Sequence, residues 1–303
     1  MEILKFNPIF KPTLWGSETW LVSAVKGSES VVINGECRGM TLPEVVEQYG
    51  EELLGKHNVE RFGTDFPLLI KFIYANQDLS IQVHPDDELA QQRHGKMGKN
   101  EMWYVVDADR GSQLIAGFRH RIDMSDYAQK VADGSIEHDL NKVNVMPGDC
   151  FYIPAGRVHG IGAGMVIAEI QQTSDVTYRI YDYKRKDADG NYRELHTELA
   201  AESIDYTVED DYRTAYESRK NEGVGLVSCP YFSTAVYDLD EPMTLDYSEL
   251  DSFVILIALQ GNATITDNEG NKTSLNAGET VLIPATTQTI SVDGEVKFLE
   301  TYV

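Results

Sequence analysis

Short apolar runs separated by turn residues dominate the chain and predict a fold built mainly from β-strands. In the N-terminal two thirds, runs rich in β-branched and aromatic residues predict strands at 66–75, 78–84, 101–106, 150–154, 165–172 and 176–183. The same pattern continues near the C-terminus between residues 252 and 284. There, the sequence DNEG at 267–270 separates two runs and predicts a hairpin turn.

Helical spacing is confined to a few segments. Thr41 and Glu44, with a proline between them, form a capping-box start, and apolar residues at helical spacing continue from there to Gly55. Further helices are predicted at 86–93, 123–132 and 196–204. The polar, acidic stretch 205–225 predicts a passage between two β units.

One sequence pattern occurs twice. The segments GDCFYIPAGRVH (148–159) and GETVLIPATTQT (278–289) share a Gly–acid pair, an apolar run and Ile-Pro-Ala at equal offsets, but the second lacks His159. A chance recurrence of a glycine turn, a strand and a proline is the alternative to duplication. We favour duplication of a small barrel, in which only the first copy keeps the polar residues needed for function. The expected division is a functional domain at 1–205 with helical insertions, a connecting segment at 206–225, and a degenerate β domain at 226–303.

The net charge of the chain limits the kinds of partner that it can bind. The 303 residues include 26 Lys and Arg against 49 Asp and Glu, for a net charge of −23. We therefore expect neither nucleic acid nor an anionic membrane as a partner, because both require clustered basic residues. A small anionic substrate remains compatible, since a few basic residues in one pocket can dominate locally.

The apolar runs and the cysteines of the sequence indicate the cellular compartment that we expect. The longest strongly apolar run, Phe253–Leu259, is too short to span a bilayer, and the first residues lack the apolar stretch of a signal peptide. The three cysteines are odd in number and widely spaced, which predicts no disulfide framework. We expect a cytoplasmic protein, either a monomer or a homodimer.

Candidate metal ligands occur on three predicted strands. Gln82 and His84 are two positions apart, so both side chains point to one face of a strand. Glu101 opens the next strand, and His159 follows the turn PAGRV. One carboxylate, two imidazoles and an amide oxygen form a mixed set that suits Zn²⁺ and tolerates other divalent metals. The alternative is that these strand histidines are only hydrogen-bonded. We predict one divalent metal, with Zn²⁺ preferred, held by His84, Glu101 and His159, with Gln82 as the candidate fourth ligand.

These residues resemble the two cupin motifs. The segment 148–159 matches the second motif, G(x5)PxGxxH, and Gln82–His84 together with Glu101 resembles the first, with Gln in place of one His. The resemblance implies double-stranded β-helix barrels with a metal inside. The predicted fold class is therefore mainly β, with two cupin-type jelly-roll barrels and a few short helices.

A closer resemblance is to the class I mannose-6-phosphate isomerases (phosphomannose isomerases), in their short bacterial form. It is carried by FPLLIKFIYANQDLSIQVHPDDELA, GKNEMWYV, GDCFYIPAGRVHGIG and EIQQTSDVTYRIYDY, and it extends over about residues 8–204. The last third of the chain matches only as a generic small β domain. The resemblance implies a metal-dependent aldose–ketose isomerase that interconverts mannose 6-phosphate and fructose 6-phosphate through an enediolate.

The resemblance also implies catalytic residues. Arg179 in TYRIYDY matches the active-site arginine of the family, and Lys71, Lys99 and Asp175 align with further active-site positions. Arg179 would stabilise the enediolate. A surface ion pair is the alternative role for this arginine.

Two residues are candidate bases. Lys99 lies two positions before Glu101, and a lysine beside a bound divalent cation loses its proton more readily. Glu169 lies in an otherwise apolar strand, where burial would make it more basic. Ser80 and Arg185 are candidate contacts to the substrate phosphate or sugar.

Three other functions fit parts of the sequence. The chain would suit a cupin isomerase that acts on a different phosphosugar. Two His and one carboxylate are also the ligand types of non-haem iron dioxygenases, although Gln82 and the Lys/Arg set argue against oxygen chemistry. A non-catalytic sugar-binding cupin would be expected to lack the ligands in both copies, whereas only the second copy lacks them.

Overall fold

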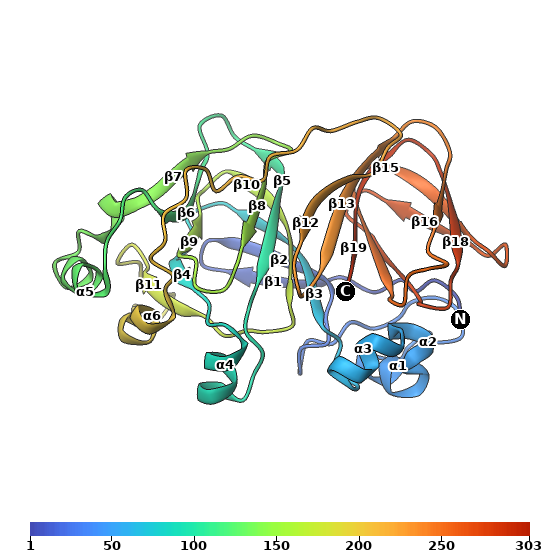
Figure 1. Cartoon of the computed structure of the whole chain (residues 1–303), viewed down its shortest axis with the longest axis horizontal. Coiled ribbons are helices and arrows are strands. Elements are labelled where there is room, and N and C mark those ends of the chain that lie inside the picture. The colour runs from blue at the N-terminus through green and yellow to red at the C-terminus, as the bar shows by residue number, and fades with distance from the viewer. The chain divides into compact units, whose positions relative to one another are not determined.

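Strands dominate the chain, as the alternation of apolar and polar residues predicts (Figure 1). The structure is a computed structural model that describes residues 1–303. The chain forms two units. The central unit comprises Phe10–Thr19 and Ile70–Thr214, and the terminal unit comprises Met1–Ile9, Trp20–Leu69 and Ala215–Val303. None of the helices has the length and apolar content needed to cross a bilayer.

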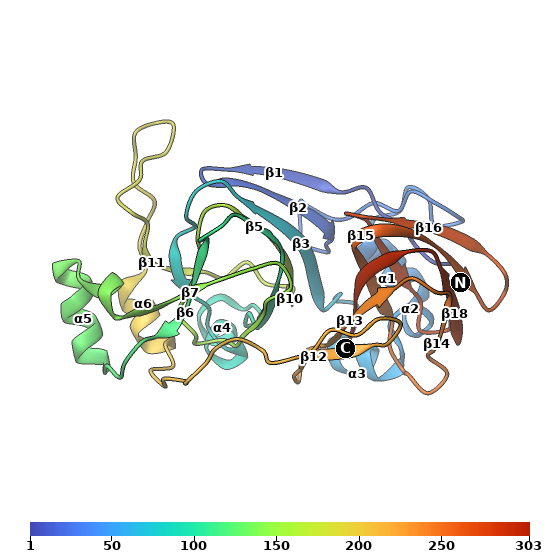
Figure 2. The same ribbon diagram turned by 90° about the horizontal axis from the view of Figure 1, so that it is seen from above.

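The central unit is built on two antiparallel sheets (Figure 2). The first has the order β1-β2-β3-β10-β5-β8, with strands at Ile9–Thr13, Gly16–Val22, Leu68–Ala75, Met165–Gln172, Glu101–Ala108 and Cys150–Ile153. The second has the order β11-β4-β9-β6-β7, with strands at Tyr178–Tyr181, Ile81–Val83, His159–Ile161, Gln113–Phe118 and Leu140–Asn144. One buried apolar cluster takes residues from both sheets, among them Trp103 and Phe151 from the first and Leu114 and Ile161 from the second. The two sheets therefore pack face to face.

The helices of the central unit begin and end where the sequence predicts. In α4 (Asp87–His94) the Asp86 side chain accepts a hydrogen bond from the Leu89 N–H, and the helix ends at Gly95 in a left-handed conformation. The α5 helix (Met124–Asp133) is followed by a 3₁₀ turn, η1 (Ile136–Asp139), and α6 spans Thr197–Ser203.

In the terminal unit the predicted helix up to Gly55 is interrupted. The capping box between Thr41 and Glu44 is present and starts α1 (Leu42–Tyr49). Gly50 takes a positive φ and separates α1 from α2 (Glu51–Leu54), and a further helix, α3 (Lys56–Phe62), follows. The sequence pattern did not predict α3, because its seven residues include only one fully buried side chain.

The terminal unit contains one eight-stranded sheet. Its main path is β12-β13-β19-β15-β18-β14, and β16 and β17 also pair with β15. The strands span Val224–Ser228, Ser233–Leu239, Val296–Tyr302, Val254–Asp267, Thr289–Asp293, Met243–Asp246, Lys272–Asn276 and Thr280–Ile283. Inward-facing residues of β15 and β17, such as Leu256 and Val281, are fully buried in its core.

The repeated sequence pattern is also a repeated local structure. Gly148 and Gly278 both have positive φ, at 97° and 84°, and each precedes a four-residue strand, β8 or β17. The following strands, β9 and β18, begin at His159 and Thr289, which occupy equal positions in the two copies.

The division into units differs from the predicted boundary near residue 205. Residues 1–9 and 20–69 group with the C-terminal strands in the terminal unit. Leu4 and Leu282 exchange two backbone hydrogen bonds of 2.9 Å, and the Asp251 carboxylate accepts the backbone N–H groups at the start of α3. The acidic stretch around residue 205 marks where the chain passes between units, but it does not reveal which earlier segments return to the terminal unit.

Candidate active site

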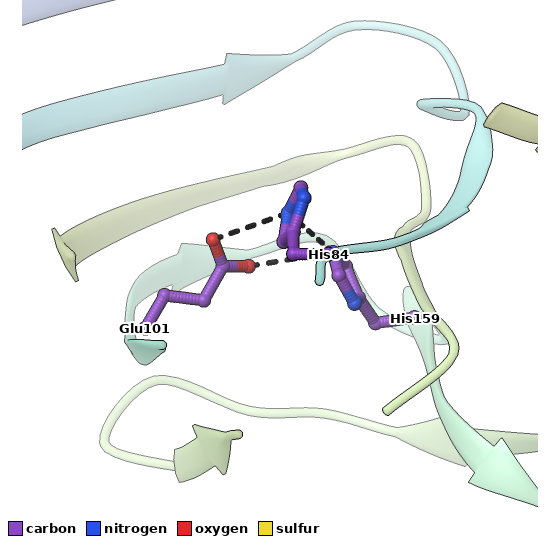
Figure 3. Close-up of side chains that lie close together, drawn as sticks. All are labelled: His84, Glu101 and His159. Carbon is purple, nitrogen blue, oxygen red and sulfur yellow. Dashed lines mark hydrogen bonds and ion pairs between the residues drawn. The ribbon is translucent and has the colours of Figure 1, made fainter. Parts of the chain in front are cut away.

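Three buried side chains converge from different strands of the central unit (Figure 3). His84 directly follows β4, Glu101 is the first residue of β5, and His159 is the first residue of β9. The Nε2 atoms of His84 and His159 are 3.2 Å apart, and each lies 3.4–3.5 Å from an oxygen of the Glu101 carboxylate. All three residues are 1% exposed.

The tautomers of the two histidines direct both lone pairs into this cluster. Nδ1 of His84 donates to the Val176 carbonyl at 2.9 Å, and Nδ1 of His159 donates to the Arg157 carbonyl at 2.8 Å. Burial lowers the pKa of His84 to about 3 and also lowers the pKa of His159, so both rings are neutral at physiological pH. A neutral imidazole held by a backbone acceptor is the form that binds metal ions.

Glu101 completes a donor set that fits a divalent metal. Burial opposes its ionisation, but the Lys99 ammonium beside it holds the pKa of this carboxyl well below its usual range. Its Oε1 is buried without a hydrogen-bond partner. Tetrahedral coordination with bonds of about 2.0–2.1 Å places ligand atoms about 3.3–3.4 Å apart. The two Nε2 atoms are 3.2 Å apart, and His84 and His159 lie 3.5 and 3.4 Å from Oε2 and Oε1 of Glu101, respectively. The three residues therefore present ligand atoms of the right type and spacing.

Gln82 lies beside these ligands. It pairs with His159 in the β4–β9 register, and its Nε2 is 3.3 Å from the Nε2 of that histidine. Its Oε1 accepts a hydrogen bond of 3.4 Å from the Ser80 hydroxyl. A half-turn of the amide exchanges its oxygen and nitrogen, so the same position offers an oxygen to the cluster.

Lysine and glutamate side chains extend the cluster along the first sheet. Lys99 Nζ donates to Glu101 Oε2 at 2.6 Å and to His84 Nε2 at 2.9 Å. Glu169 Oε1 lies 3.7 Å from Lys99 Nζ and 3.1 Å from Lys71 Nζ. Burial raises the pKa of Glu169. The structure thus brings both candidate bases and Lys71 into one buried network with the candidate metal ligands.

Arg179 lies on β11, at the edge of the second sheet next to β4. It lies opposite Gln82 in the β11–β4 register, and its guanidinium donates to the Glu194 carbonyl at 2.9 Å while its Nε is buried without a partner. Burial and nearby Arg193 lower its pKa. Arg185 donates to Asp182 at 2.6 Å.

Similarity to characterised sequences identifies the family. The chain is 34% identical over 287 residues to mannose-6-phosphate isomerase ManA of Bacillus subtilis, covering 88% of this chain and 89% of the relative. It is also 34% identical over 292 residues to mannose-6-phosphate isomerase of Streptococcus mutans, covering 96% and 90%. The chain belongs to the type I phosphomannose isomerases. It is therefore an enzyme of the mannose-6-phosphate isomerase family.

Family models and solved structures agree with this membership. The catalytic domain of type I phosphomannose isomerase matches residues 7–117, and the cupin domain of mannose-6-phosphate isomerase matches residues 224–303. The mannose 6-phosphate isomerase of Bacillus subtilis superposes with a TM-score of 0.90 at 28% identity, with full coverage of both chains. A variant of phosphomannose isomerase from Salmonella typhimurium shares the fold with a TM-score of 0.80 at 16% identity, covering 100% of this chain and 99% of that one.

One residue aligned with the family's active site lies apart from the cluster. Asp175 is about half exposed and forms an ion pair of 2.5 Å with Lys96, which is also exposed. It follows the end of β10 in the turn before β11, where its side chain points toward solvent and not toward the barrel interior. The structure does not bring Asp175 to the cluster, and its catalytic role stays a prediction.

Two residues near the cluster were not predicted from the sequence. Glu18 on β2 lies 3.5 Å from Lys71 Nζ, and Gln171 pairs with Glu101 in the β10–β5 register. Gln171 is fully buried, and its Oε1 has no partner. Spacing within one strand identified Gln82 and His84, but neighbours on other strands depend on the register, which one sequence does not give. The acidic residue Glu18 between Trp15 and Trp20, in a segment that otherwise lacks charge from Gly16 to Ala24, was the available sequence signal.

Proposed function

We propose that this phosphomannose isomerase interconverts mannose 6-phosphate and fructose 6-phosphate at the His84–Glu101–His159 cluster, with Zn²⁺ as its metal. One observation carries the proposal. Two imidazole lone pairs and an unpartnered carboxylate oxygen lie within 4.8 Å of one another, next to a buried lysine–glutamate network. Both a metal site and a proton-transfer group are therefore available in one enclosed place.

The metal would be held by His84, Glu101 and His159, with Gln82 as the fourth ligand. When bound there, a divalent ion would supply Lewis acidity toward the oxygens of the sugar. Nitrogen and oxygen donors at tetrahedral spacing favour Zn²⁺. A cytoplasmic location is part of the same proposal, and the three free cysteines support it.

Glu169 is the proposed base. Its buried Oε1 lies 3.1 Å from Lys71 Nζ, which holds the carboxylate in place, whereas the Lys99 ammonium already donates to Glu101 and His84 and has no lone pair to accept a proton. The carboxylate removes the proton from C2 of the open-chain aldose, which leaves an enediolate, and the resulting carboxylic acid returns that proton to C1. A second proton moves from the oxygen on C2 to the oxygen on C1, which completes the ketose. Burial raises the pKa of Glu169 and so makes the carboxylate a better base.

The cations around Glu169 have separate tasks. The ammonium of Lys99 offsets the negative charge that develops on the enediolate, and Arg179 adds a second positive charge from β11. Lys71 holds the Glu169 carboxylate. Ser80 and Arg185 are the proposed contacts to the phosphate end of the substrate.

The experiment that tests this function follows the C2 proton. Wild-type protein should move deuterium from C2 of C2-deuterated mannose 6-phosphate to C1 of the fructose 6-phosphate that it forms, and Glu169→Gln should lower kcat by about a hundredfold or more with its metal retained. Lys99→Met should lower kcat but leave a measurable rate. If Glu169→Gln keeps near-normal turnover while Lys99→Met is inactive, Lys99 is the base. If mannose 6-phosphate is not converted at all, the assigned substrate is wrong.

A further inference from the structure

A row of alternating charges crosses the first sheet of the central unit. Glu18 lies on β2, Lys71 on β3 and Glu169 on β10, and these three strands are consecutive neighbours in the sheet. Lys71 Nζ is 3.5 Å from Glu18 Oε2 and 3.1 Å from Glu169 Oε1. The row continues from Glu169 to Lys99, whose ammonium contacts the metal ligands.

The side chains of this row are largely removed from water, so their charges must balance one another. The side chains of Lys71 and Glu169 are less than 10% exposed, and that of Glu18 is 16% exposed. Ionised groups removed from water need partners of opposite charge. Burial disfavours the charged form of Lys71, yet Glu169, Glu18 and Glu101 together hold its pKa above the usual range. One fixed ammonium is therefore shared between two carboxylates.

Glu169 is held from more than one side. Trp103, its register partner on β5, donates its indole N–H to Oε2 at 3.2 Å, while the two ammonium groups approach Oε1. Of the groups that contact Glu169, Lys71 is the one that also contacts Glu18, on the side away from the metal ligands. The position of the Lys71 ammonium therefore depends on its electrostatic attraction to Glu18 as well as to Glu169. If Glu18 carried no charge, the ammonium would pair with Glu169 alone.

We propose that Glu18 is a positioning residue for the isomerisation, which acts by sharing the ammonium of Lys71 and so fixes where the carboxylate of Glu169 stands. Glu18 acts on Glu169 through the ammonium of Lys71, so its role is that of a positioning residue and not of a catalytic one. The inference rests on the proposed role of Glu169 as the base. A displacement of a reacting group by about 1 Å can cost about a hundredfold in rate, so a partial shift of Glu169 would be visible in turnover.

The test compares three variants of the full-length, metal-loaded enzyme. Glu18→Gln keeps the size of the side chain and removes its charge, Glu18→Asp keeps the charge, and Glu47→Gln is the matched control at an exposed position of α1. Glu18→Gln should lower kcat by about tenfold and leave KM within about twofold. Glu18→Asp should recover part of the rate, and Glu47→Gln should behave as wild type. Metal content should be equal in all four proteins.

An isotope effect separates positioning from a loss of folded enzyme. With C2-deuterated mannose 6-phosphate, the deuterium effect on kcat should be larger in Glu18→Gln than in wild type, because removal of the C2 proton becomes slower relative to the other steps. A smaller fraction of active enzyme would lower kcat without changing the isotope effect. The inference is overturned by unchanged kcat, by an unchanged isotope effect, or by a rise in KM alone. The activity of Glu169→Gln, measured alongside, shows whether the proposed base itself has failed.

Discussion

Arg179 and Gln82 stand directly opposite each other on the adjacent antiparallel strands β11 and β4. Opposed residues of an antiparallel pair project to the same face of a sheet. Gln82 in turn pairs with His159 on the next strand, β9. The row Arg179–Gln82–His159 thus joins the arginine to the candidate metal ligands through backbone pairing, and it places Arg179 on the same face of the second sheet as Gln82.

Replacement of Arg179 tests whether this cation stabilises the enediolate. Arg179→Ala should lower kcat by about a hundredfold or more and change KM much less, because a preorganised charge of this kind acts mainly on the transition state. Arg179→Lys keeps the charge but loses the planar fork, so it should recover only part of the rate. Steady-state measurement of both constants distinguishes these results.

Two other outcomes would assign Arg179 differently. A rise in KM at constant kcat would make it a phosphate anchor. Unchanged constants in Arg179→Ala would remove it from the catalytic residues.

Asp182 should control substrate binding through Arg185. Its carboxylate accepts hydrogen bonds of 2.6 Å from Arg185 and 2.7 Å from Arg193, next to Tyr183 and Lys184, which both have positive φ. Asp182→Asn removes the charge that holds both guanidinium groups. KM for mannose 6-phosphate should rise about tenfold, which corresponds to one charge-assisted hydrogen bond of about 1.4 kcal/mol, with kcat changed much less.

The matched control for this prediction is Asp189→Asn, an exposed residue in the same loop. It should leave KM unchanged. Equal KM values in Asp182→Asn and wild type would show that Arg185 does not need this anchor to bind the phosphate, or that it does not bind it.

Residues within one strand or one turn were the predictable part of this site. The two-residue spacing of Gln82 and His84, the strand opening at Glu101 and the turn before His159 follow from local pattern, and the structure brings all four together. The end of α4 at Gly95 was also predictable, because a left-handed glycine cap has a local sequence signal.

Pairing between distant strands was not predictable from one sequence. The contact of Glu18 with Lys71 and the pairing of Gln171 with Glu101 depend on strand order and register. The placement of Asp175 is a similar case. The family resemblance gave its position along the chain, but not its ion pair with exposed Lys96.

A buried carboxyl in the terminal unit predicts a dependence of stability on pH. Glu300 on β19 accepts a hydrogen bond of 3.3 Å from Tyr247 and is 6% exposed. Burial raises its pKa, although hydrogen bonds from Tyr237 and Tyr247 oppose the shift. Because the folded pKa lies above the unfolded one, its contribution to stability is complete below the unfolded pKa and is lost as the pH rises through the folded pKa.

Glu300→Gln isolates this contribution, since glutamine does not ionise. The free energy of unfolding of wild type relative to this variant should fall as the pH rises from 4 to 8, as measured by urea unfolding. A difference between the two proteins that is constant over this range, or that grows with pH, would contradict the shift assigned to Glu300.

The most direct test of the account is the metal content and turnover of His159→Ala beside those of His57→Ala, an exposed histidine in α3. After dialysis, elemental analysis should find about one zinc per chain in wild type and His57→Ala. His159→Ala should hold none and should not convert mannose 6-phosphate to fructose 6-phosphate. Chelation of wild type should abolish turnover, and added Zn²⁺ should restore it. Full zinc content in His159→Ala, or undiminished isomerase activity in metal-free wild type, would contradict the central claim.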